Sequence, residues 1–181
     1  MSDQNTAVEV DASSKFEDSL PTTSSAIMAH LDALALSYQL HEHPPLRTVE
    51  DSQNHRGEMT GGHIKNLYLR DRKKNNYLVV AEETKDIDLK TLSDAIGAAR
   101  LSFGSSDRLM EFLGVRPGAV SPLTLYNDHD HNVRLVMDKS LYDYDEINVH
   151  PLVNDKTLTM KIADLDTFLE KTGHYAERIM I

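Results

Sequence analysis

A lysine and an asparagine stand side by side at Lys65 and Asn66, shortly after the pair Gly61 and Gly62. Because glycine adopts positive φ at little cost, the two glycines indicate a loop or a close approach of the backbone to a ligand. The apolar run that follows, 67–69, has high β propensity. Lysine suits a phosphate or carboxylate as a flexible point charge. The pattern predicts a loop that presents a cation and an amide at the mouth of a strand, with a solvated hairpin shoulder as the alternative.

Only one member of this pair can face a substrate if the strand already includes both residues. Successive side chains of a strand point to opposite faces, so Lys65 and Asn66 would both reach the substrate only from a loop. Of the two, we expect Lys65 to be the residue that does so.

Two later stretches carry further candidates. The segment 114–122 reads GVRPGAVSP and places Gly118 four residues before Pro122. Glycine and proline restrict the backbone in complementary ways, so this segment can present N–H groups to a carbonyl oxygen or form the wall of a small pocket. A helix stop followed by a strand entry would explain the same residues. His150 precedes Pro151, which biases its backbone away from helix. It could orient water, hold a substrate amine or bridge to a ribose, or it could be structural.

In this order and spacing, the Lys65-Asn66 pair, the segment from Gly118 to Pro122 and His150 resemble the YbaK-type aminoacyl-tRNA deacylase family. The most similar branch is that of the free-standing homologues of the bacterial prolyl-tRNA synthetase editing domain, called ProXp-ala or PrdX. The resemblance covers residues 23 to 175.

The resemblance implies a trans-editing hydrolase that deacylates mischarged aminoacyl-tRNA, with Ala-tRNA(Pro) as the expected substrate. Hydrolysis of such an activated ester needs a positioned water, stabilisation of the developing anion and tight placement. This fits a chain in which no Ser-His-Asp triad can be assembled. The residues expected to be catalytic are Lys65, His150 and Gly118. Those expected to bind substrate are Asn66, Ala119, Val120, Ser121 and Pro122.

Other functions compete with this interpretation. The same chemistry could serve another small amino acid, cysteine or serine. The chain could also be a non-catalytic tRNA-binding partner of a synthetase, or a small-molecule hydrolase on the same scaffold. The joint presence of Lys65, Gly118, Pro122 and His150 favours catalysis. The expected partners are a tRNA acceptor end that carries a small amino acid and, in addition, prolyl-tRNA synthetase.

Composition narrows the remaining classes. With 29 acidic and 19 basic residues, the formal net charge of −10 argues against a general nucleic-acid binder and against DNA as a partner. An enzyme that handles only a tRNA end needs a local basic patch, for which the segment 70–74 is a candidate. The chain has no cysteine, which excludes disulfides and thiolate nucleophiles.

We expect no cofactor and no metal, because the pair His41 and His43 and the cluster 129–131 lack a clear third ligand. The sequence contains no run of about 18 apolar residues, so it predicts no membrane span. Its polar start is unlike a secretory signal. We therefore expect a cytoplasmic protein that does not contact membranes.

The hydrophobic pattern predicts one domain over 23–181 after a disordered leader over 1–22. Strands and helices alternate without a regular βαβ repeat, which indicates an α+β domain. The resemblance adds a mixed, mostly antiparallel, barrel-like sheet flanked by helices. Expected helices cover 24–36, 48–57 and 164–172, with one more from Asp88 or Thr91 and one capped by Ser105 or Ser106. Expected strands cover 38–43, 65–69, 77–81, 123–126, 133–138, 146–149 and 157–161.

Overall fold

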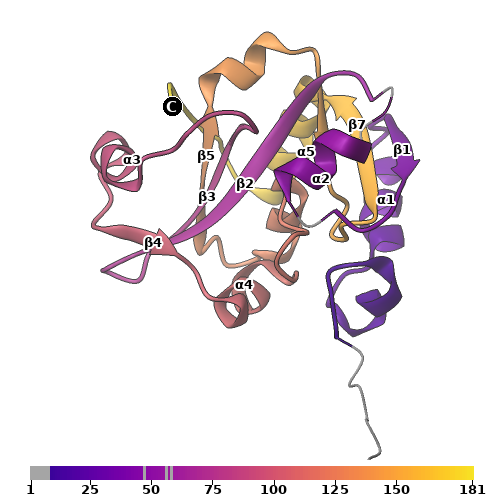
Figure 1. The fold of residues 1–181 in the computed structure, drawn as a ribbon, viewed down its shortest axis with the longest axis horizontal. Coiled ribbons are helices and arrows are strands. Elements are labelled where there is room, and N and C mark those ends of the chain that lie inside the picture. Colours follow the sequence, from indigo (N-terminus) through magenta and orange to yellow (C-terminus); the bar gives the residue numbers. More distant parts are fainter. Residues whose placement is uncertain (1–8, 47, 56, 58) are drawn as a thin grey trace, which may run out of the picture.

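A computed structural model describes residues 9–46, 48–55, 57 and 59–181. Within them, eight strands form a mixed sheet in the order β1-β7-β6-β2-β3-β5-β8, with β4 paired to β2 (Figure 1). The strands are β1 (Tyr38–Glu42), β2 (Gly62–Asp71), β3 (Asn76–Glu82), β4 (Leu101–Phe103), β5 (Val133–Asp138), β6 (Glu146–Val149), β7 (Lys156–Lys161) and β8 (Glu177–Ile179). The helices are α1 (Ser24–Ala33), α2 (Val49–His55), α3 (Leu89–Ile96), α4 (Ser106–Leu113) and α5 (Ile162–Thr172). Short 3₁₀ helices are η1 (Ser14–Ser19), η2 (Pro122–Asn127) and η3 (Lys139–Asp143). The predicted α+β fold with a mixed sheet and flanking helices is confirmed.

Strand β2 organises the sheet. It pairs antiparallel with β3 from Ile64 to Arg70. On its other edge it pairs with β6 only at Gly62 and His63, and with β4 only from Leu69 onward. Between these two pairings, residues 64–67 have β3 on one side and no strand on the other among the described residues. Figure 1 shows β2 running diagonally past α2 to β4. Residues of α2 and residues 64–66 border a common hollow, so this open edge lies beside α2.

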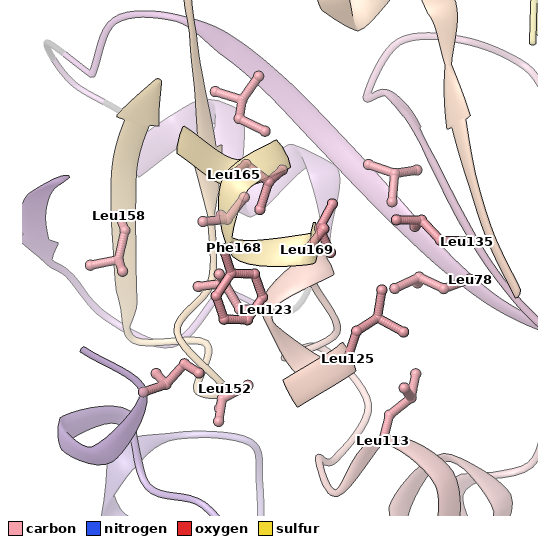
Figure 2. Close-up of a cluster of buried hydrophobic side chains, with 14 of the residues drawn as sticks. Leu78, Leu113, Leu123, Leu125, Leu135, Leu152, Leu158, Leu165, Phe168 and Leu169 are labelled. Carbon is pink, nitrogen blue, oxygen red and sulfur yellow. The ribbon is translucent and has the colours of Figure 1, made fainter. Parts of the chain in front are cut away.

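Two apolar clusters pack on opposite faces of β3 and β5. Leu78 and Val80 belong to the larger cluster, whereas Tyr77 and Val79 belong to the smaller one. This alternation follows from the two-residue repeat of a strand. Figure 2 shows the larger cluster, where α5 and η2 meet the sheet; its labelled residues include Leu123, Leu125, Leu135, Leu165, Phe168 and Leu169. The smaller cluster is closed by Leu92 and Ile96 of α3.

The helix ends follow the sequence closely. The Asp88 side chain accepts hydrogen bonds from two N–H groups at the start of α3, and the Ser105 side chain accepts one, from Arg108, at the start of α4. Gly114 and Gly173 end α4 and α5 with φ of 67° and 81°, conformations that glycine adopts most readily. Thr48 Oγ1 accepts from the N–H of Asp51 at 3.0 Å, so a threonine side chain caps the start of α2.

The strand predicted over 123–126 is wrong, because these residues form the 3₁₀ helix η2. Pro122 stands at its first turn, where the fixed φ of proline favours helical backbone. The Oγ of Ser121 accepts from the N–H of Leu123 at 3.2 Å, and Thr124 Oγ1 donates to the carbonyl of Ser121 at 2.6 Å. The apolar run 123–126 suits either a strand or a helical turn, and these local hydrogen bonds stabilise the helical turn.

The leader predicted to be disordered over 1–22 is ordered where the structure describes it, and its first eight residues lie outside the described residues. Residues 14–19 form η1. Ser14 donates to Asp155 through its N–H at 3.0 Å and through its Oγ at 2.6 Å. The N–H of Asn154 donates to the carbonyl of Ala12 at 2.9 Å. Residues 9–22 therefore form an N-terminal strap, held by hydrogen bonds that sequence composition does not show.

None of the helices formed by the described residues combines the length and the apolar character that crossing a bilayer requires.

Candidate functional site

Lys65 and Asn66 lie inside strand β2, so the prediction that a loop presents them is wrong. The strand already begins at Gly62. The side-chain amide of Asn148, in β6, donates to the carbonyls of Thr60 at 2.8 Å and Gly62 at 3.2 Å. These bonds hold the entry to β2 against β6 and extend the regular strand toward the glycines.

A cavity of about 190 Å³ opens along the free edge of β2, where β2 and β6 separate. It brings together five of the predicted site residues from three distant parts of the chain: Lys65, Asn66, Gly118, Val120 and His150. The other three predicted residues, Ala119, Ser121 and Pro122, are buried behind the cavity and do not line it. Lys65 and Asn66 both border the cavity because it follows the edge of the strand rather than one of its faces.

The ammonium group of Lys65 has a fixed position at this wall. Its Nζ donates a hydrogen bond to the main-chain carbonyl of Lys85. The side chain of Lys85 is itself fixed, with Nζ 2.8 Å from Asp138 Oδ2 and 3.1 Å from the carbonyl oxygen of Ile181. Burial alone would raise the pKa of Asp138, but hydrogen bonds from Lys85 and Ser140 outweigh it and lower the pKa. Asp138 is thus an anion that anchors the segment on which Lys65 rests.

The side chain of Asn66 contains an unsatisfied polar atom. Its Oδ1 is buried and has no hydrogen-bond partner among the described residues. Leaving such an acceptor unpaired costs about 1–3 kcal/mol, so it is rare in proteins without a reason. Because Asn66 lines both the main cavity and an adjoining one of about 40 Å³, a bound donor such as a hydroxyl would satisfy this oxygen.

The loop from Gly118 forms the wall opposite β2. Gly118 has φ of 95°, and a Cβ there would lie 3.4 Å from Asn154 Nδ2 and 3.8 Å from the Leu46 carbonyl. These are ordinary contact distances, so it is the positive φ, rather than a lack of space, that favours glycine here. The Oγ of Ser121 donates to the carbonyl of His150 at 2.6 Å, which joins this loop to the histidine loop. Val120 then contributes a compact apolar side chain to the cavity.

His150 presents a neutral imidazole to the cavity. Its Nδ1 lies 2.8 Å from the carbonyl of Lys156, which can only accept, so Nδ1 carries the proton and Nε2 is the acceptor. Burial lowers the pKa of His150 and the nearby His43 lowers it further, while the Lys156 carbonyl opposes this shift. A neutral ring with an acceptor nitrogen can orient a water molecule or take up a proton.

The other histidines singled out in the sequence bind threonines or main chain. His41 Nε2 is 3.0 Å from Thr159 Oγ1, and His43 Nε2 is 2.7 Å from Thr157 Oγ1. His131 Nε2 is 2.8 Å from the carbonyl of Thr172. Among the described residues, no group of three or more His, Asp or Glu side chains is arranged to hold a metal ion.

Sequence reasoning missed several lining residues. The most important is Glu83, a carboxylate only 7% exposed that borders the cavity just after β3. The available signal was the pair of acids, Glu82 and Glu83, that follows the buried run 77–81. Thr48, Val49 and Ser52 line the cavity from α2 and the residue before it. The basic segment 70–74 lies at the β2–β3 hairpin, at the far end of β2 from the cavity.

Comparison with known proteins identifies the family. The family model described as the aminoacyl-tRNA editing domain matches residues 43–168. The prolyl-tRNA editing protein ProX of Acetoanaerobium sticklandii is 41% identical over 150 residues, which cover 82% of this chain and 92% of that protein. The prolyl-tRNA synthetase associated domain-containing protein 1 of Mus musculus is 34% identical over 149 residues, covering 80% and 88%. A solved structure described as a candidate trans-editing enzyme for prolyl tRNA synthetase has the same fold, with a TM-score of 0.65 at 19% identity over 87% of this chain and 96% of that one.

The chain belongs to the aminoacyl-tRNA editing domain family. It is therefore an enzyme of the aminoacyl-tRNA hydrolase class.

Proposed function

We propose that this enzyme is a trans-editing deacylase whose substrate is Ala-tRNA(Pro). The observation that carries the proposal is the convergence of Lys65, Asn66, Gly118, Val120 and His150 on one cavity. The relative from Acetoanaerobium sticklandii, named a prolyl-tRNA editing protein, supports tRNA(Pro) as the RNA.

Each lining group has a task in ester hydrolysis. The Lys65 ammonium binds the terminal phosphate, and Asn66 Oδ1 accepts a hydrogen bond from a ribose hydroxyl. Main-chain N–H groups of Gly118 and Val120 stabilise the carbonyl oxygen as it becomes anionic, whereas that of Ala119 already donates to the carbonyl of Arg116. His150 Nε2 orients the attacking water. The water oxygen bonds to the carbonyl carbon, and the bond from that carbon to the ribose oxygen breaks. Of the two protons of the water, one goes to the ribose oxygen and the other to solvent, and the amino acid leaves as a carboxylate.

The size of the cavity supports alanine over proline. A volume of about 190 Å³ must hold the amino acid and part of the terminal ribose. One methyl group is worth only about 1–3 kcal/mol of attraction, so steric exclusion of the larger ring must supply much of the selectivity. Gly118 and Val120 form the wall that would exclude it.

A deacylation panel tests the proposal. Purified protein is mixed with tRNA(Pro) charged with alanine, cysteine, serine or proline, with and without chelator. Alanine should be released at least about tenfold faster than proline, and chelator should change nothing. Similar rates for alanine and proline would refute the steric sieve, faster release of cysteine or serine would reassign the substrate, and hydrolysis of none would favour a non-catalytic tRNA partner.

The wall is tested by Val120→Ala, which widens the cavity. Cleavage of Pro-tRNA(Pro) should rise relative to Ala-tRNA(Pro), whereas Val10→Ala, a change at an exposed side chain outside the cavity, should leave the ratio unchanged. The name of the mouse relative also supports association with prolyl-tRNA synthetase, which co-sedimentation with that synthetase would test.

A further inference from the structure

Glu83 is the one acidic side chain among the described residues that line the 190 Å³ cavity. Glutamate is seldom buried to 7% exposure unless its charge is matched. Its N–H donates to the carbonyl of His63 at 3.0 Å, which places Glu83 opposite His63 and two strand positions from the pairing of Lys65 with Ala81. The cavity therefore holds an anion and a cation close together on neighbouring strands.

An aminoacyl ester has charges that match this arrangement. Its α-ammonium lies one carbon from the reacting carbonyl, while the terminal phosphate lies on the ribose side. Among the lining groups, Lys65 would repel an ammonium. The hydroxyls of Thr48 and Ser52, the amide of Asn66 and the neutral Nε2 of His150 carry no negative charge and bind an ammonium more weakly than a carboxylate does. A carboxylate offers about four acceptor sites, so Glu83 can serve its protein contacts and a substrate ammonium together.

We propose that Glu83 binds the α-ammonium group of the aminoacyl ester and so makes a free amine a condition for cleavage. This inference rests on the proposed function, since it assigns one residue to one part of that substrate. It has a consequence for selectivity: an ester whose amine is already acylated, as in peptidyl-tRNA, loses this contact and brings an uncharged amide beside a buried carboxylate. The enzyme then spares N-acylated esters.

The test compares Ala-tRNA(Pro) with N-acetyl-Ala-tRNA(Pro). The wild-type enzyme should cleave the free-amine ester at least about tenfold faster in kcat/KM. Glu83→Gln should lower kcat/KM for Ala-tRNA(Pro) by about ten- to a hundredfold, the value of one charge-assisted hydrogen bond, and leave the acetylated ester nearly unchanged. Glu111→Gln, at an exposed carboxylate of α4 that pairs with Arg108, is the matched control and should change neither rate.

Each alternative outcome has a distinct meaning. If Glu83→Gln lowers kcat/KM equally for both esters, Glu83 only positions protein groups. If the wild type cleaves both esters equally fast, the enzyme does not recognise the amine. Either result overturns the inference while the deacylase function stands. Cleavage of neither ester by the wild type would refute the proposed function itself. If Glu83→Gln fails to fold, Glu83→Asp keeps the charge at a shorter reach. It should retain part of the preference for the free amine, and an equal loss on both esters would again overturn the inference.

Discussion

A cavity lies at each end of the β2–β3 strand pair, and the larger of the two cavities is the less suited to bind a ligand. The cavity near the β2–β3 hairpin measures about 600 Å³, against about 190 Å³ at the Lys65 end. In the large cavity, polar groups bind one another: His174 Nε2 is 2.9 Å from Asp128 Oδ2, and Asn76 Oδ1 accepts from Tyr68 Oη at 2.6 Å.

The small cavity differs in the state of its polar groups. It contains the unpartnered Oδ1 of Asn66, the buried carboxylate of Glu83 and the neutral ring of His150. Such groups are costly to the folded protein and useful to a substrate. An unsatisfied amide oxygen, a buried carboxylate and a neutral histidine ring that border one cavity are thus a better guide to this site than volume.

The largest difference between the two cavities should come from their cations. Lys65→Ala should lower kcat/KM for Ala-tRNA(Pro) about ten- to a hundredfold, because one charge-assisted phosphate contact is lost. Arg134→Ala, in the large cavity, removes a cation that binds Glu177 and the carbonyl of Ile96 and should leave turnover unchanged. Single-turnover deacylation measures the rates of both variants, and circular dichroism checks that both are folded. Near-normal turnover by a folded Lys65→Ala variant would show that Lys65 is not part of the site.

Substitutions of two asparagines, Asn66 at the small cavity and Asn76 at the large one, should affect catalysis and stability in opposite ways. Asn66→Leu should lower kcat/KM by about tenfold and change the free energy of unfolding by no more than about 1 kcal/mol, because an unsatisfied oxygen is removed. Asn76→Leu should do the opposite. It leaves the buried Tyr68 hydroxyl without its acceptor, which costs about 1–3 kcal/mol, while kcat/KM stays unchanged. Urea unfolding and deacylation rates check both, and a large stability loss in Asn66→Leu would contradict the comparison.

The smallest expected effect is that of pH near neutrality. Burial lowers the pKa of His150 below 6.5, so its ring is neutral above that value and kcat/KM should vary less than about twofold between pH 7 and 8. Activity should fall only as pH drops through the lowered pKa. The unfolded state also binds more protons there, so the stability due to neutral His150 is lost from about pH 6.5 downward.

The stability that comes from the polar groups near the large cavity should be lost only at a lower pH. Burial would raise the pKa of Asp128, but hydrogen bonds from His174, Val133 and Asn132 outweigh it and lower the pKa below 3.8. This contribution to stability is complete above that value and is lost as pH falls through the lowered pKa. A pH–rate profile from pH 3 to 8 measures the loss of activity, and urea unfolding midpoints over the same range measure the loss of stability at His150 and at Asp128. A rate inflection above pH 6.5 would contradict the assignment to His150.

Much of the fold could be predicted because its signals are local. Caps such as Asp88 and Ser105 and stops such as Gly114 act within one turn of helix. The site was only partly predictable, since Glu83 and Ser52 reach it through strand pairing and helix placement that no short pattern encodes. The 3₁₀ helix at 122–127 shows the same limit on a smaller scale, because a short apolar run suits either periodicity.

The free edge of β2 has a consequence for solubility. Unpaired strand edges are templates for strand addition by other chains, and proteins protect them with short lengths and with charged side chains, lysine above all. The open segment spans only residues 64–67 and carries Lys65 in its middle. Lys65, which we propose binds the substrate phosphate, therefore also discourages edge-to-edge association, and a neutral residue at this position would make the unliganded enzyme more prone to aggregate.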